Sequence, residues 1–200
     1  MKFLFLALLF GAPALACEPN TLVLDYPKDA SDDAASPVQV TFTVDGNTLH
    51  AHFDVKGPVL SGKPKYAPNE YPYMFDVTEL FVSAEGGLPY YEFEVSPYNQ
   101  TLQVKILDLK HPFVNNVNMG LETKATRSPK GWTTDLSVPL DRLGWQGDVG
   151  KIVGNAYAIL GKKPNRRFFV RSPLPPQKKP NFHAPTAFQP LLDCAKDPST

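Results

Sequence analysis

The residues of this chain that could do chemistry are few, and Asp76 and Glu79 come nearest to a catalytic pair. Enzymes that hydrolyse glycosidic bonds place two carboxyl groups about 5–9 Å apart across the bond. Asp76 and Glu79 are three positions apart, so in an extended strand their side chains point to opposite faces of a sheet. The spacing argues against paired acid and base catalysis. It leaves two interpretations of a single carboxylate here: hydrogen bonding to a ligand, or satisfaction by backbone groups and solvent.

No other catalytic or cofactor signature stands out in the sequence. No glycine-rich phosphate loop follows a predicted strand, and no Gly-x-Ser-x-Gly elbow is present. The four histidines are scattered, although His50 and His52 share one face of a predicted strand. The pair lacks the remaining ligands of a metal motif, so we predict no metal site. We therefore expect no catalytic residues, metal ligands or cofactor, and scattered Asp and Asn residues leave a structural calcium ion open.

Aromatic residues in loops are the best candidates for ligand contacts. Tyr66, Tyr71 and Tyr73 lie in and just after an irregular segment, 56–72, that is rich in glycine, proline and lysine. Loops on a rigid sheet scaffold commonly carry binding residues. An equally good interpretation is that these tyrosines pin the loop to the sheet. Trp145 follows a Leu-Gly turn, where it could be exposed, and is a further candidate.

The segments that must position these residues have the pattern of β-strands. Apolar residues alternate with polar ones on both sides of Asp45-Gly46-Asn47, which predicts a hairpin with one face in the core. No helix of three turns can be placed, and the regular spacing of strands and turns predicts an all-β antiparallel sandwich of the jelly-roll or immunoglobulin-like kind. We expect the proline-rich tail, 172–190, to wrap over the surface rather than join a sheet. Further strands are predicted at 77–83, 91–95, 102–106, 132–138, 152–159 and 167–170.

The amino terminus reads as a secretory signal peptide covering residues 1–16. Lys2 precedes an apolar run that is too short to span a bilayer, and Ala14-Leu15-Ala16 has the small-x-small pattern of a cleavage site. We expect a mature chain of one domain, 17–200, in the periplasm or the extracellular medium. The cysteine after the cleavage site permits a lipoprotein, but that pattern prefers a larger aliphatic residue where this chain has Ala14.

The two cysteines stand near the two ends of the mature chain. An even number of cysteines in an exported protein favours pairing, and domain termini often lie close together. We therefore predict a disulfide between Cys17 and Cys194. The competing interpretation is a lipid anchor on Cys17 and a free Cys194.

Composition restricts the classes of partner. The chain is 42% hydrophobic and 12% aromatic, which is enough for a core, and its 20 basic residues balance its 20 acidic ones. A balanced charge argues against binding to nucleic acid, and no segment is long and apolar enough for an integral membrane helix. We interpret the short basic groups Arg166-Arg167 and Lys178-Lys179 as solvated loop charges. We expect a monomer.

Five segments, taken in order, resemble those of one known family. The first has the pattern aromatic-x-x-Asp-x-x-Glu-x-Phe, and the last has the pattern Phe-His-x-Pro-x-x-Phe. Their order and spacing are similar to those of carbohydrate-binding module family 9 and its DOMON-like relatives, which are β-sandwich domains. The five segments are Tyr73–Phe81, Tyr90–Pro97, Gly131–Leu140, Gly154–Tyr157 and Asn181–Phe188.

The resemblance implies a site that binds the end of a sugar chain between two aromatic rings. Carried over by position, Tyr73 stands where one stacking tryptophan would be, and Glu79 stands where a carboxylate binds hydroxyl groups. Two positions depart from the family pattern. Arg171 replaces the second tryptophan, and Ala158 replaces a strand arginine. One wall of the aromatic clamp and one charged contact are therefore missing.

These observations together predict an exported, non-catalytic protein that binds carbohydrate. Its site would be built from Tyr73, Glu79 and the loop tyrosines, with Arg171 at the rim. Three alternatives stay open at this point. They are a haem-binding relative, an accessory to a glycan-acting hydrolase, and an envelope interaction protein that has lost sugar binding.

Overall fold

A computed structural model describes residues 17–24, 36–63, 71–84, 86–110, 113–115, 117–176 and 181–194. The predicted signal peptide, 1–16, and Tyr66 lie outside these ranges. Within them the regular elements are β-strands and short 3₁₀ helices, which confirms the predicted all-β class. A search of the same ranges finds no helix with the length and hydropathy needed to cross a membrane.

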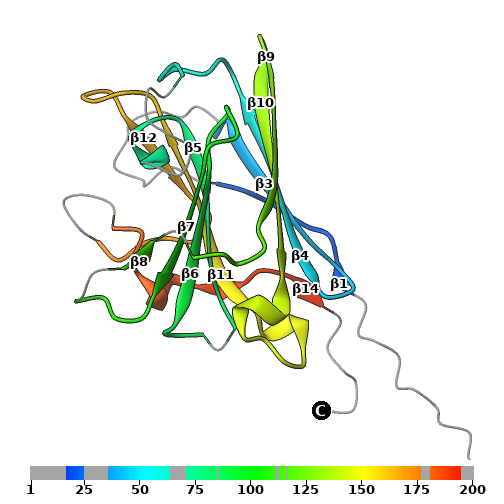
Figure 1. Cartoon of the computed structure of the whole chain (residues 1–200). Helices are drawn as coiled ribbons and strands as arrows, with labels where there is room; N and C mark the ends of the chain where they lie inside the picture. The colour runs from blue at the N-terminus through cyan, green and yellow to red at the C-terminus, as the bar shows by residue number, and fades with distance from the viewer. Residues whose placement is uncertain are drawn as a thin grey trace, which may run out of the picture.

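Figure 1 shows how the elements follow one another along the chain. The 3₁₀ helices are η1 (Pro72–Met74), η2 (Leu140–Leu143), η3 (Val149–Lys151) and η4 (Pro185–Ala187). The strands are β1 (Cys17–Glu18), β2 (Asn20–Val23), β3 (Val38–Asp45), β4 (Thr48–Lys56), β5 (Val77–Ser83), β6 (Tyr90–Val95), β7 (Thr101–Ile106), β8 (Val114–Asn115), β9 (Glu122–Ser128), β10 (Gly131–Pro139), β11 (Val153–Leu160), β12 (Arg167–Val170), β13 (Gln189–Pro190) and β14 (Asp193–Cys194).

Two antiparallel sheets face each other in the described part of the chain. The first sheet has five strands in the order β2-β3-β4-β10-β9, and the second has the order β12-β11-β5-β6-β7-β8, with β13 added beside β11. Figure 1 shows the two layers, with β3, β4, β9 and β10 in one and β5, β6, β7 and β11 in the other. The architecture is the predicted β-sandwich.

The alternation of side chains explains why the first sheet forms as it does. Along β3 and β4 the apolar residues are buried, apart from the partly buried Val44, and the polar residues between them are partly or fully exposed. One face is therefore in the core and the other meets solvent. Gly46, with φ of 56°, allows the tight turn of the predicted hairpin. The edge strand β9 was not predicted, because its sequence Glu-Thr-Lys-Ala-Thr-Arg-Ser shows no apolar alternation. It forms by pairing with β10.

The second sheet is covered on both faces. Its inner face packs against the first sheet, and the core between them includes Phe42, Phe53, Phe93 and Trp132. Its outer face carries a second apolar cluster that includes Phe81, Tyr90, Tyr157 and Phe188. Every residue of β5 and β6 is therefore buried, which is why these strands do not simply alternate between core and solvent.

The carboxyl-terminal tail supplies part of this outer cover. Phe182 and Phe188 pack onto the outer apolar cluster, as expected for a segment that wraps over the surface. The expectation that the tail joins no sheet needs one correction, because Gln189 and Pro190 form β13 and pair with β11. Pro190 is the last residue of that pairing, where the loss of one backbone N–H is tolerated.

The two ends of the described chain are joined by the predicted disulfide. Cys17 and Cys194 are bonded with an S–S distance of 2.03 Å, and their strands β1 and β14 pair as a two-stranded ribbon. The bond removes the interpretation that Cys194 is a free thiol beside a lipid-anchored Cys17.

Candidate functional site

Three buried glutamates gather on the outer face of the second sheet. Glu79 on β5 lies directly across from Glu94 on β6, and Glu92 is two residues before Glu94, so all three side chains share one face. Their exposed fractions are 2%, 7% and 1% for Glu79, Glu92 and Glu94. Glutamate is almost never buried so deeply without a partner, so this cluster is the most unusual feature of the molecule.

Burial determines the protonation of the cluster. It is the largest cause of the raised pKa of all three glutamates, and it raises the pKa of Glu92 to about 7. The charge of Glu92 raises the pKa of Glu79 further. A side-chain hydrogen bond between Glu94 and Glu92 raises the pKa of Glu94 and lowers that of Glu92. Glu94 therefore holds a proton more strongly than Glu92 does.

Arg166 brings a positive charge to the same face. Its guanidinium lowers the pKa of Glu79 against the dominant effect of burial, and burial in turn lowers the pKa of Arg166 itself. The interpretation of Arg166 as a solvated loop charge is wrong, because its Nε and Nη2 atoms are buried and have no hydrogen-bond partner among the described residues. Arg167, the next residue, is exposed as predicted.

Glu79 also has unused hydrogen-bonding capacity. Within the described ranges no hydrogen bond reaches its carboxyl group, and the causes of its raised pKa include none. Two buried donor atoms of Arg166 thus have no partner, and the carboxyl group of Glu79 receives no hydrogen bond from the described residues. Buried polar groups without partners are rare in proteins, which makes this position a candidate for ligand contacts.

Tyr73 forms the aromatic edge of this site. Its backbone N–H donates to Oε2 of Glu94 at 2.9 Å, which ties η1 to the carboxyl cluster. The Tyr73 ring meets the Tyr71 ring edge-on, with centroids 5.9 Å apart and planes at 88°. The two residues are 37% and 51% exposed, and burial followed by the charge of Glu94 raises the pKa of Tyr73. An exposed aromatic corner therefore stands beside buried carboxyl groups.

His183 contacts the cluster from the carboxyl-terminal tail. Its Nδ1 is 2.9 Å from the Tyr90 hydroxyl, and its Nε2 is 3.9 Å from Oε2 of Glu92. Burial lowers the pKa of His183 to about 4, so the ring is neutral at physiological pH. The tautomer protonated at Nε2 lets Tyr90 donate to Nδ1 while the Nε2–H points toward Glu92.

Asp76 has a structural role that the sequence left open. Its Oδ2 accepts from the N–H groups of Leu60 at 2.6 Å and Ser61 at 2.7 Å, and its Oδ1 accepts from the N–H of Gly161 at 2.5 Å. Its own N–H donates to the Ser61 hydroxyl. Asp76 thereby joins two loops at the end of β5, and these loops lead to Tyr73 and Arg166. The interpretation in which backbone groups satisfy this carboxylate is confirmed.

The structure brings only part of the predicted site together. Tyr71, Tyr73 and Glu79 lie at one end of the second sheet, whereas Tyr66 lies outside the described residues. Glu92, Glu94, Arg166 and His183 were missed. The available signal was the alternation in Tyr90-Tyr91-Glu92-Phe93-Glu94, which places two acidic groups on one face of an otherwise apolar strand.

Arg171 lies elsewhere than predicted. It follows Val170 of the outer face, so its side chain points to the opposite side of the sheet, and its guanidinium lies 5.9 Å from the Phe42 ring. Its nitrogen atoms donate to the carbonyl groups of Gly154, Gln189 and Pro190. Arg171 therefore holds the tail onto β11, and it does not form the rim of the carboxyl cluster.

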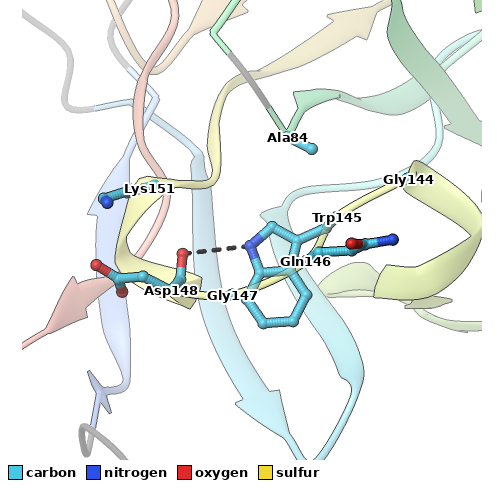
Figure 2. A pocket seen from close by; sticks show the side chains of 7 residues that line it. All are labelled: Ala84, Gly144, Trp145, Gln146, Gly147, Asp148 and Lys151. Carbon is cyan, nitrogen blue, oxygen red and sulfur yellow. Dashed lines mark hydrogen bonds between the residues drawn. The ribbon is translucent and has the colours of Figure 1, made fainter.

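Trp145 lines a separate surface pocket of about 480 Å³, shown in Figure 2. Its indole N–H donates to the carbonyl oxygen of Asp148 at 3.2 Å. Ala84, directly after β5, also lines the pocket, whereas Tyr73 precedes β5, so the two sites are about 20 Å apart along the strand. In Figure 2 the Asp148 carboxylate and Lys151 lie to one side of the indole and Gln146 to the other, so the polar groups do not converge.

The raised pKa of Glu92 predicts a pH-dependent stability. Between the ordinary glutamate pKa of 4.5 and about 7, the unfolded chain has lost this proton while the folded chain keeps it. The free energy of unfolding therefore falls as pH rises, by roughly 3 kcal/mol for this group over that interval. Glu92→Gln removes the titration, so the variant should be more stable than the wild type at pH 8 but not at pH 4.5.

Denaturant unfolding at a series of pH values measures this difference. The lowered pKa of His183 acts in the opposite direction, because stability is lost as pH falls from 6.5 toward 4. Above pH 6.5 the His183 ring is mostly neutral in both the folded and the unfolded chain, so the comparison there reports on Glu92. Parallel stability curves for the wild type and Glu92→Gln would show that Glu92 titrates normally in the folded protein.

Comparison with known proteins agrees with this architecture. No family model and no curated protein matches the chain. A protein of Bacteroides uniformis ATCC 8492, assigned provisionally to carbohydrate binding, aligns with a TM-score of 0.70 and 21% identity over 88% of this chain and 86% of its own. A family 9 carbohydrate-binding module of Caldicellulosiruptor kristjanssonii aligns in two structures. The cellotriose complex aligns with a TM-score of 0.52 and 16% identity over 82% of this chain and 81% of its own. The glucose complex aligns with a TM-score of 0.50 and 15% identity over 90% of each chain.

These similarities are at the level of the fold, since every identity is below 25%. They agree with the ordered motifs of the sequence and with the two facing antiparallel sheets. This chain has the β-sandwich fold of carbohydrate-binding module family 9.

Proposed function

We propose that this protein is an exported, non-catalytic saccharide-binding protein whose site is the carboxyl cluster on the outer face of the second sheet. The observation that carries the proposal is the pairing of an unused acceptor on Glu79 with unused donors on Arg166. A sugar hydroxyl can donate one hydrogen bond and accept others at the same time. One hydroxyl placed between these two groups would satisfy both.

The aromatic corner beside the cluster supplies the second element of sugar recognition. Sugar rings present C–H faces that pack against aromatic rings, while their hydroxyl groups need oriented partners. Tyr73 and Tyr71 stand at right angles, so one ring offers its face where the other offers its edge. This corner takes the place of the two-walled clamp that the family resemblance implies, because Arg171 points away from the site.

The structural neighbours support a saccharide as the ligand. The Caldicellulosiruptor kristjanssonii module holds cellotriose in one structure and glucose in another. Export is supported by the disulfide, which persists in oxidising compartments, and by the signal-like sequence of residues 1–16. The mature protein would act in the periplasm or outside the cell.

A binding role fits the carboxyl groups better than glycoside hydrolysis does. Glu79 and Glu94 are cross-strand neighbours on the floor of the site, with Cβ atoms about 5 Å apart. A glycosidase needs its two carboxyl groups on either side of the scissile bond. Side by side beneath the ligand, these two groups cannot flank a bond. A released-sugar assay on the purified protein should therefore detect no hydrolysis.

Calorimetric titration of the mature protein with gluco-oligosaccharides tests the proposal. Glu79→Gln keeps the shape of the side chain but replaces an ionisable carboxyl group with a neutral amide. The affinity for the saccharide should therefore fall roughly 10- to 100-fold. Tyr73→Ala removes a stacking surface, and affinity should fall roughly tenfold. Trp145→Phe, in the separate pocket, is the matched control and should leave affinity unchanged.

Two outcomes would overturn the proposal. The first is an intact, folded wild-type protein that binds nothing on a glycan array. The second is saccharide binding that Trp145→Phe weakens while Glu79→Gln does not. The second outcome would show that the saccharide binds in the Trp145 pocket of Figure 2.

A further inference from the structure

Two histidines stand on the solvent-facing side of the first sheet, far from the carboxyl cluster. His50 and His52 are alternate residues of β4, so their side chains share one face. His50 is partly exposed, and the His52 side chain is 49% exposed. This face is the outer surface of the five-stranded sheet, opposite the core. Nothing in the saccharide-binding proposal uses it.

Strand β10 supplies each ring with one hydrogen-bond partner. Register places Ser137 across from His50 and Asp135 across from His52. The Nδ1 of His50 is 2.8 Å from the Ser137 hydroxyl, and the Nδ1 of His52 is 2.6 Å from Oδ1 of Asp135. A neutral His52 must donate its Nδ1 proton to that carboxylate, which leaves the lone pair on Nε2. Within the described residues no hydrogen bond reaches Nε2 of either ring.

This is the arrangement that metal-binding histidines adopt. Such a histidine binds the ion through one ring nitrogen and donates the other N–H to a carboxylate or another oxygen, which orients the ring. Imidazole nitrogens suit copper, zinc and nickel ions. We propose that His50 and His52 bind one divalent late transition-metal ion through their Nε2 atoms, with Asp135 and Ser137 holding the rings. This proposal departs from the sequence-based prediction of no metal site, because the sequence did not show these two ring partners on β10.

The spacing of the strand permits such binding. The Cα atoms of alternate residues are about 7 Å apart along a strand. Two nitrogen atoms that bind one ion each lie about 2 Å from it, so they must be closer to each other than these Cα atoms are. The exposed rings must therefore lean toward each other. No group of three or more His, Cys, Asp and Glu residues within the described ranges could hold a metal by itself. The ion would thus keep water in its other positions.

The charges around the two rings favour a cation. Asp135 lies beside His52, and Asp54 is the next residue of β4 on the same face. Glu122 of β9 is across from Ser137. Asp45 of β3 also lies on this face, across from Thr48. Lys56 and Lys124 bring positive charge to it, so its four acidic residues outnumber its two basic ones.

Titration of the mature protein with Cu²⁺ alone, followed by calorimetry and electron paramagnetic resonance, tests the proposal. Copper is chosen because divalent copper binds nitrogen sites most tightly in the first-row series. We expect one saturable equivalent with the spectral signature of two imidazole nitrogens. His50→Gln/His52→Gln should lose it. Copper binding at the α-amino group or at other histidines is common to the two proteins, so it drops out of the difference between their titrations.

A third variant separates a built site from two accidental neighbours. Asp135→Asn keeps both ligands but weakens the orienting bond, so affinity should fall about tenfold. The same Cu²⁺ titration should be unaffected by Glu79→Gln, because the carboxyl cluster lies on the other sheet. Equal copper binding by the wild type and the double variant, or unchanged affinity in Asp135→Asn, would overturn the inference.

Discussion

Replacement of Asp76 by alanine is expected to lower the free energy of unfolding by about 3–5 kcal/mol. The change leaves the N–H groups of Leu60, Ser61 and Gly161 without their acceptor. Asp76 is completely buried, so little water can reach these groups, and each unsatisfied buried donor costs about 1–3 kcal/mol. Asp76→Ala should also abolish saccharide binding, because the loops that carry Tyr73 and Arg166 lose their common attachment.

Denaturant unfolding and calorimetric titration measure these two effects. Asp54→Ala is the matched control, since Asp54 is exposed on β4, and its stability should stay within about 0.5 kcal/mol of the wild type. The stability of Asp76→Asn should lie between those of Asp76→Ala and Asp54→Ala. Its carbonyl oxygen still accepts from the N–H groups of Leu60 and Ser61, whereas its NH₂ group faces the N–H of Gly161 and cannot accept from it. A stability loss below 1 kcal/mol in Asp76→Ala would contradict the role given to this residue.

Removal of the disulfide is expected to have a similarly large effect. The bond between Cys17 and Cys194 spans 177 positions of the 200-residue chain. The chain-entropy model gives about 5 kcal/mol for a loop of this length, and measured losses in small exported domains run from about 2 to 5 kcal/mol. For a domain of this size, the melting temperature of Cys17→Ser/Cys194→Ser should fall by roughly 10 °C.

A reducing agent provides the internal control for this prediction. Dithiothreitol should lower the melting temperature of the wild-type protein to that of the double variant, and it should not change the melting temperature of the variant. Saccharide binding below the melting temperature should persist in both, because the carboxyl cluster is held by β5, β6 and Asp76 rather than by the chain ends. A variant as stable as the oxidised wild type would show that the ends are held by packing.

The carboxyl cluster shows why the site could be only partly predicted. Glu79 was identified because the family resemblance assigns it a role. Glu94 has the same burial and lies directly across from it, but that pairing depends on the register between β5 and β6. Arg166 comes from another loop and His183 from the tail, and no local pattern places them on the same face of the sheet.

Arg171 illustrates the opposite case, in which a position in a motif led to the wrong place. One residue determines the face of a strand to which a side chain points, because alternate residues point in opposite directions. Val170 lies across from Tyr157 on the outer face, so Arg171 turns inward toward Phe42. The resemblance assigns Arg171 its position from the order of residues along the chain alone, and that order could not specify the direction of the side chain.

The sequence by itself determined the strands with clear alternation, the hairpin at Asp45-Gly46-Asn47, the pairing of the two cysteines and the fold family. These features follow from local periodicity, from turn chemistry and from an even count of cysteines. Only the tertiary structure decided which polar groups meet: Glu79 with Glu94 and Arg166 on one sheet, and His52 with Asp135 on the other. The physical reason is that such meetings depend on strand register and on cover from distant segments, and neither is encoded in the spacing of neighbouring residues.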